Sequence, residues 1–156
     1  MSDPTPDLNP KGATAATAAA NAAVGATLPL DDPHDHECAG RGLVAPPASN
    51  QVLTAGGWPV WDLDAYAFLD GDAPDTVNPS LWRQARLNRN AGLFEVAPGI
   101  HQVRSYDLSN MTLIEGRTGW IVVDPLTVQE TAAAALALAR RHLGERSVSA
   151  VIFTHS

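Results

Sequence analysis

The sequence predicts an α/β protein whose C-terminal part is a strand–helix–strand unit. Residues 119–124 (GWIVVD) and 148–153 (VSAVIF) are short, apolar and rich in Val and Ile, which is typical of buried strands in a parallel sheet. Between them, residues 128–143 repeat apolar side chains at the spacing of an amphipathic helix. Such units connect by a right-handed crossover, so we expect the two strands to run parallel. The apolar side chains of the helix are Ala132, Leu136, Ala139 and Leu143.

Both ends of this helix carry recognisable signals. Thr127 and Glu130 form a capping-box pattern, in which each side chain accepts a hydrogen bond from the backbone N–H of the other. The basic residues 140–142 favour the negative end of the helix dipole, and Gly144 ends the helix.

The residues before this unit predict further strands and a helix. Residues 100–104 form a strand after the turn Pro98-Gly99, and we expect His101 in it to be exposed. Residues 110–115 pair with 119–124 as a hairpin through the intervening glycines. Asn78 and Pro79 have the residue types of an N-cap and a first helical position, so a helix should begin there and stop at Gly92.

The N-terminal part has weaker patterns. Residues 1–10 are expected to be a loose polar tail, 13–26 an alanine-rich helix that needs a partner surface, and 28–60 an extended loop rich in Pro and Gly. We therefore divide the chain into a leader, 1–57, and a domain, 58–156. The sequence stops directly after a strand and a histidine, so we expect a truncated domain.

Composition excludes some classes of function. The net charge of −7 and the lack of a basic stripe argue against a nucleic-acid partner. The sequence contains no run of about 18 apolar residues, so it predicts no membrane-spanning helix. No signal peptide is visible at the start, which favours a cytoplasmic location. Three potential zinc ligands alternate in one segment, but without an evident fourth we interpret them as solvated loop residues. These are His34, His36 and Cys38.

Chemistry is predicted where the two parallel strands end. Asp124 closes the first strand and Thr154-His155 follows the second. Ligands of open α/β sheets bind beyond the carboxyl ends of the strands, so a carboxylate and an imidazole should share one rim. Alternatively, Asp124 is a turn residue and His155 an incidental histidine.

One short motif and three long stretches resemble the sequences of known proteins. VIFTHS is similar to the opening of the T-H-x-H-x-D-H zinc motif of the metallo-β-lactamase superfamily. More specifically, WDLDAYAFLDGDAPDTVNPSLWRQ, GLFEVAPGIHQVRSYDLSNMTLIEG and GWIVVDPLT resemble the zinc-dependent linear alkylsulfatases of that superfamily, whereas residues 34–38 depart from them. The resemblance covers most of residues 58–156.

The resemblance implies a fold, a reaction and a site. The fold would be the first half of an αββα metallo-β-lactamase fold behind a helical and extended leader. The reaction would convert an alkyl sulfate ester and water to an alcohol and sulfate at a dinuclear zinc centre, in a homodimer. His155 would be the first zinc ligand. Asp124 would be a carboxylate that orients the ligands without binding zinc, and Thr154 would be the loop residue before His155. Because one imidazole cannot hold catalytic zinc, we expect residues 1–156 alone to be inactive. Some such relatives are exported.

Several alternatives stay open. The same fold also serves thioester and lactam hydrolases, and a degenerate relative would keep the fold without zinc. Tyr106, Asp107 and Asn110 lie in a loop near the expected rim, where they either line a substrate channel or cap backbone groups. The aromatic side chains either contact an alkyl chain or pack in the core or between subunits. They are Trp58, Trp61, Tyr66, Phe68 and Trp82.

Overall fold

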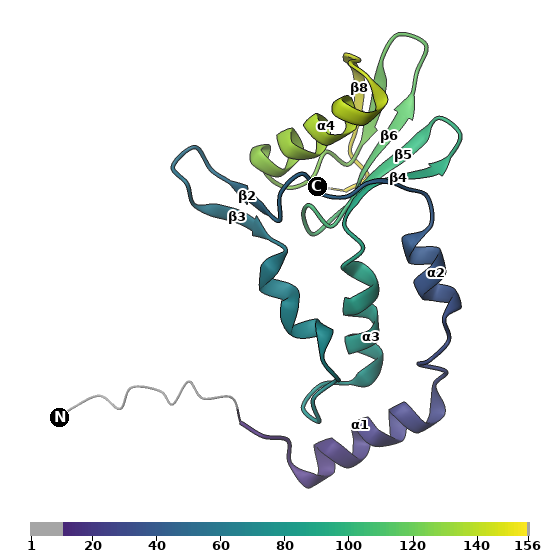
Figure 1. Cartoon of the computed structure of the whole chain (residues 1–156), viewed down its shortest axis with the longest axis vertical. Coiled ribbons are helices and arrows are strands. Elements are labelled where there is room, and N and C mark those ends of the chain that lie inside the picture. Colours follow the sequence, from purple (N-terminus) through teal and green to yellow (C-terminus); the bar gives the residue numbers. More distant parts are fainter. Residues whose placement is uncertain (1–10, 156) are drawn as a thin grey trace, which may run out of the picture.

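The computed structural model describes residues 11–155, so the predicted tail at 1–10 lies outside it. Figure 1 shows the larger sheet and the last helix at one end of the molecule and the other helices at the opposite end. No helix among the described residues is both long and apolar enough to cross a membrane.

A six-stranded sheet organises the first of these two regions. Its strand order is β1-β4-β5-β6-β7-β8, and every neighbouring pair is antiparallel except the parallel pair β7–β8. The predicted hairpin and the predicted parallel pair are therefore confirmed. The strands are β1 (Leu43–Ala45), β4 (Gly92–Ala97), β5 (Ile100–Arg104), β6 (Met111–Glu115), β7 (Trp120–Val123) and β8 (Val148–Ile152).

Helix α4 (Gln129–Leu143) joins β7 to β8 and packs against the core. Its fully buried positions are Thr131, Ala135, Leu138 and Ala139, so the predicted stripe is displaced by about one position. Only Ala139 belongs to both sets. Ala132, Leu136 and Leu143 flank the core and are partly buried. The spacing identifies a helical face, but the contact with the sheet decides which row of that face is innermost.

The predicted capping box at the start of α4 is wrong. Val128 is the N-cap and makes no capping hydrogen bond through its side chain. The Thr127 hydroxyl instead donates to the Asp107 carboxylate, at 2.6 and 2.7 Å from its two oxygens. A charged acceptor brought by another loop outcompetes the local backbone partner, because hydrogen bonds to ions are stronger than neutral ones.

Residues 28–60 are not one extended loop. They contain helix α2 (His34–Gly40), strand β1, strand β2 (Gln51–Leu53) and the start of β3 (Pro59–Asp62), which pairs with β2. The alanine-rich helix is confirmed as α1 (Ala15–Thr27). Each missed element has at most seven residues, too few for a sequence periodicity to be visible. The boundary at 57/58 stays a prediction, although β1 of the predicted leader pairs with β4.

A 3-10 helix, η1 (Asp64–Asp70), precedes α3 (Pro79–Asn88). Asn78 caps α3 as predicted, because its side chain accepts from the Ser80 N–H at 2.9 Å. However, α3 ends at Asn88 and Gly92 begins β4, a strand that the sequence did not indicate. Gly92 has φ 131°, and a Cβ there would lie 2.3 Å from the Ala45 carbonyl oxygen. This glycine therefore permits β1 to approach β4 rather than ending a helix.

Two expectations about exposure are also wrong. His101 is 7% exposed and packs edge-on against the buried Trp120, because the alternation of β5 places it beside Val103 on the core face. Conversely, every residue of β8 is exposed. Apolar composition identifies a strand, but β8 is the edge of this sheet and no described strand pairs with its outer side.

Candidate active site

Asp124, Thr154 and His155 meet at the carboxyl ends of β7 and β8. The Asp124 carboxylate accepts from the Thr154 N–H at 2.9 Å and from the Thr154 hydroxyl at 2.6 Å. His155 Nδ1 lies 2.9 Å from the Thr154 hydroxyl oxygen and 3.8 Å from Asp124 Oδ1. The predicted shared rim is therefore confirmed in its geometry, while the roles of these residues stay predictions.

This hydrogen-bond chain selects one tautomer of His155. A hydroxyl has a single proton, and the Thr154 hydroxyl donates it to Asp124 across the short 2.6 Å contact. The same oxygen must then accept from His155, so Nδ1 carries the hydrogen. A neutral imidazole protonated at Nδ1 leaves the Nε2 lone pair free for a metal ion. The side chain is 68% exposed, so the ring is accessible from solvent.

The backbone at Asp124 is held in an uncommon conformation. Its φ is 54°, in the left-handed region that non-glycine residues rarely adopt, while its N–H donates to the Ile152 carbonyl oxygen at 2.9 Å. The hydrogen bonds from the Thr154 hydroxyl and N–H lower the pKa of the Asp124 carboxyl below its ordinary value. Asp124 is therefore a carboxylate at neutral pH and orients the Thr154–His155 segment.

The described residues do not complete a metal site. Within 11–155, no group of three or more His, Cys, Asp or Glu side chains is arranged to hold a metal ion. His155 supplies one imidazole, whereas catalytic zinc is held by three protein ligands. His34, His36 and Cys38 lie on α2 rather than in a loop, and His34 Nε2 contacts Cys38 Sγ at 3.6 Å. These three residues form no metal site either.

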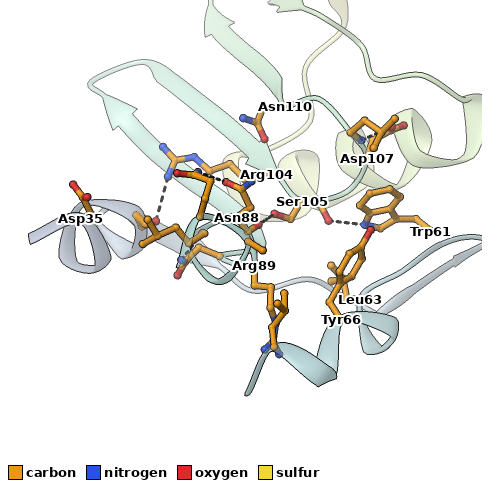
Figure 2. Close-up of a pocket in the computed structure, with 17 residues that line it drawn as sticks. Asp35, Trp61, Leu63, Tyr66, Asn88, Arg89, Arg104, Ser105, Asp107 and Asn110 are labelled. Atoms are coloured by element: carbon orange, nitrogen blue, oxygen red, sulfur yellow. Dashed lines mark hydrogen bonds between the residues drawn. The ribbon is translucent and has the colours of Figure 1, made fainter. Parts of the chain in front are cut away.

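A cavity of about 650 Å³ lies between the sheet and the helical region. Figure 2 shows side chains from α2, β3, η1, α3 and the loop after β5 converging on it. Its lining combines apolar side chains with guanidinium, amide and carboxylate groups. The apolar and aromatic lining residues include Trp61, Leu63, Tyr66, Leu69 and Leu87, and the polar ones include Asp35, Asn88, Arg89, Asn90, Arg104, Asp107 and Asn110.

The three predicted channel residues have different positions. Asn110 lines the cavity. It also lies near Asp124, because Thr112 pairs with Val123 and the start of β6 is therefore next to the end of β7. Asp107 also touches the cavity, but its carboxylate faces the start of α4, where it accepts from Thr127 and Thr131. Tyr106 belongs to the core, and its hydroxyl accepts from the Ala48 N–H at 3.3 Å.

Arg104 is a cavity residue that no sequence pattern indicated. Its guanidinium lies 4.4 Å from the centre of the Phe94 ring and donates to Gln102 Oε1 and the Ala39 carbonyl oxygen. Burial lowers the pKa of Arg104 from its ordinary value, but an arginine remains a cation at neutral pH. The available signal was its position, a charged residue that ends an alternating strand next to the candidate loop.

Comparison with known proteins shows which family these features resemble. Residues 105–156 match the metallo-beta-lactamase superfamily. An (R)-specific secondary-alkylsulfatase of Pseudomonas sp. is 53% identical over 96% of this chain, and a linear primary-alkylsulfatase of Pseudomonas sp. is 50% identical over 94%. An alkyl/aryl-sulfatase of Saccharomyces cerevisiae is 44% identical over 90%. The chain spans 22% of the length of each of these three relatives.

A solved structure shares the fold. The stereoselective inverting sec-alkylsulfatase of Pseudomonas sp. superposes with a TM-score of 0.85 at 53% identity, covering 93% of this chain and 23% of that protein. The predicted α/β fold class is thereby confirmed. In sequence and in fold, the chain is similar to about a fifth of the length of these alkylsulfatases, and its residues 105–156 are similar to the metallo-beta-lactamase superfamily.

Proposed function

We propose that this chain forms part of an alkyl sulfate ester hydrolase, which releases an alcohol and sulfate. One observation carries the proposal: Asp124, Thr154 and His155 form a hydrogen-bonded chain on the rim where α/β sheets bind ligands, and this chain favours the tautomer that leaves Nε2 of His155 free. The alkylsulfatase names of relatives up to 53% identical support it. By the same resemblance we propose a dinuclear zinc centre and a homodimer.

Each residue on the rim would have a distinct task. His155 would bind a metal through Nε2, Thr154 would accept the Nδ1 hydrogen, and Asp124 would keep the Thr154 hydroxyl oriented. Bound zinc would supply a water of lowered pKa and stabilise charge on the sulfate oxygens. Because residues 11–155 place one imidazole at the rim, the remaining ligands would have to come from elsewhere, and we expect no turnover from the chain alone.

The cavity would receive the alkyl chain of the substrate. Its volume of about 650 Å³ lies in the range of small-molecule sites, about 300–1,000 Å³. Its apolar lining residues suit a hydrocarbon chain. Asn110 lines the cavity and lies at the end of the sheet where β7 leads into Asp124. A substrate with its chain in the cavity would thus extend its sulfate group toward the rim.

A chimera tests the reaction. In the secondary-alkylsulfatase relative, the matching segment would be replaced by this chain, and release of sulfate from secondary and linear alkyl sulfates would be measured. We expect the chimera to be active and its His155→Ala variant to be inactive. Asp124→Asn should lower kcat/KM by about 10–100-fold, the range for residues that orient a metal ligand. The matched control is Asp72→Asn, an exposed aspartate distant from the rim in sequence.

Three results would contradict the proposal. They are an inactive but folded chimera, an active His155→Ala variant, and a chimera that hydrolyses thioesters or lactams in preference to alkyl sulfates. Turnover of an alkyl sulfate by the isolated chain with added zinc would contradict the expected inactivity of the chain alone.

Chain-length dependence tests the cavity. Leu63→Ala removes part of the apolar wall, so KM of the chimera should rise more for a dodecyl than for a hexyl sulfate. Leu81→Ala is the control, because Leu81 is 66% exposed and does not line the cavity. Equal changes in KM for both substrates would place the alkyl chain elsewhere.

A further inference from the structure

The loop between β7 and α4 contains two strained residues. Asp124 has φ 54° and Leu126 has φ 72°, and neither is a glycine. Pro125 between them has a fixed φ, so the segment has few alternative conformations of its own. Left-handed conformations at non-glycine residues are unfavourable and persist only where surrounding contacts impose them. The contacts that hold this loop therefore decide where the Asp124 carboxylate points.

The N-terminal end of the loop is held within the sheet and at its rim. The Asp124 N–H donates to the Ile152 carbonyl oxygen, and the Asp124 carboxylate accepts from Thr154. Leu126, in the middle, packs its side chain against the core. These contacts leave Thr127, the last residue before the N-cap of α4, as the point where the loop needs a second attachment.

Asp107 provides that attachment from the loop between β5 and β6. Its carboxylate accepts from the Thr127 N–H at 3.0 Å, from the Thr127 hydroxyl at 2.6 and 2.7 Å, and from the Thr131 hydroxyl at 2.7 Å. The Leu108 N–H also donates to it, at 2.6 Å. Asp107 is 7% exposed, and solvent therefore weakens these hydrogen bonds little.

We propose that Asp107 is a positioning residue that holds the strained 124–127 loop and, through it, the hydrogen bonds between Asp124 and Thr154 at the rim. Its significance for catalysis rests on the function proposed above, but the geometric claim does not. Asp107 touches neither Thr154 nor His155; it acts through Thr127 and the three residues that precede it. Two carboxylates, Asp107 and Asp124, thus attach the opposite ends of one short loop.

A simpler role would be the capping of α4 alone. The Asp107 carboxylate lies at the positive N-terminal end of that helix, where a negative charge is favourable. The two roles differ in what happens at Thr154. A cap stabilises α4 and the whole fold, whereas a loop anchor specifically protects the Thr154 N–H, which donates to Asp124 at 2.9 Å.

Amide hydrogen exchange of the full 156-residue chain separates these roles, alongside chemical unfolding. Asp107→Asn and Thr127→Val should accelerate exchange of the Thr154 N–H by about tenfold or more beyond any change from global stability, since each removes hydrogen bonds to an ion. Thr127→Ser keeps the hydroxyl and should behave like the parent. Thr131→Val removes a donor on α4 outside the loop, and it should lower stability without selective exchange at Thr154.

Two outcomes would overturn the proposal. If Thr131→Val accelerates exchange of the Thr154 N–H as selectively as Thr127→Val does, Asp107 acts only as a cap of α4. A parent chain whose Thr154 N–H is unprotected would remove the contact that Asp107 is proposed to maintain. If Asp107→Asn does not fold, Thr127→Val and Thr127→Ser decide the question. The exchange measurement uses neither zinc nor substrate. An inactive chimera would therefore not change its interpretation, and a negative exchange result would not contradict an active chimera.

Discussion

The sheet with α4 and the helical region built from α1, α2, η1 and α3 are stabilised in different ways. The sheet region contains a cluster of buried apolar side chains centred on residues such as Leu113 and Trp120. In the helical region as described, Leu69 is the one buried side chain, and the elements are joined by hydrogen bonds and by an aromatic pair between Phe68 and Trp82. A single side chain, that of Arg83, donates to the Leu30 and Asp32 carbonyl oxygens and to the Asp35 carboxylate.

This difference has a consequence for the candidate site. The rim at Asp124 and His155 is attached to the densely packed sheet, while much of the cavity wall comes from the weakly buried helices. Regions with few buried apolar contacts open locally at low free-energy cost. The candidate site therefore combines a rim at the end of the exposed strand β8 with a cavity wall drawn largely from helices that bury few side chains.

The largest expected effect compares the same substitution in the two regions. Leu113→Ala should lower the free energy of unfolding by about 2–5 kcal/mol, because Leu113 is fully buried and a cavity would remain. Leu81→Ala, at an exposed position of α3, should change it by less than about 0.5 kcal/mol. Urea denaturation measures both. Similar losses for the two variants would show that the regions do not differ in packing.

Acid should destabilise the sheet region through Asp107. Burial alone would raise the pKa of Asp107, but hydrogen bonds from Thr127, Thr131 and Leu108 outweigh it and place the pKa below its ordinary value. A carboxyl whose pKa is lower in the folded state stabilises the fold above the unfolded-state pKa, near 3.9, and this contribution is lost as pH falls through the folded-state pKa. Unfolding free energies from pH 7 to pH 2.5 measure the loss.

The control for this pH dependence is the Asp107→Asn variant. It lacks the titrating group, so its stability should fall less steeply over the same pH range. Parallel curves for the parent and the variant would assign the acid sensitivity to other carboxylates.

A smaller and local effect is expected at Arg83. Arg83→Met keeps the length of the side chain but removes its hydrogen bonds to residues 30, 32 and 35, at a cost of about 1–2 kcal/mol. Hydrogen exchange should accelerate in α2 and leave β5–β7 unchanged. Arg86→Met is the control, since Arg86 is exposed on the same helix. Faster exchange throughout the sheet would mean that the two regions unfold as one unit.

The smallest effect concerns the start of α3. Asn78→Ala removes the side chain that caps the Ser80 N–H and should cost about 1 kcal/mol. A decrease in the melting temperature of a few degrees, with the sheet unchanged in exchange, would fit a local role for this cap. An unchanged melting temperature would show that α3 is held by its tertiary contacts alone.

The sequence predicted elements whose evidence is local. The strand–helix–strand unit, the hairpin before it, the Asn78 cap and the alanine-rich helix depend on residues close together in the chain. The meeting of Asp124 with His155 also followed from sequence, because a parallel crossover leaves few choices of topology. Short elements such as β1 and β2 could not be predicted, since three residues contain no measurable periodicity.

What only the tertiary structure decided involves distant residues. Asp107 holds Thr127 across twenty positions, which displaces the capping box that the local pattern indicated. The burial of His101 depends on Trp120 and the exposure of β8 on its place at the edge of the sheet. Local sequence expresses backbone preferences and alternation, whereas burial and the choice among competing hydrogen-bond acceptors depend on which remote groups the fold brings into contact.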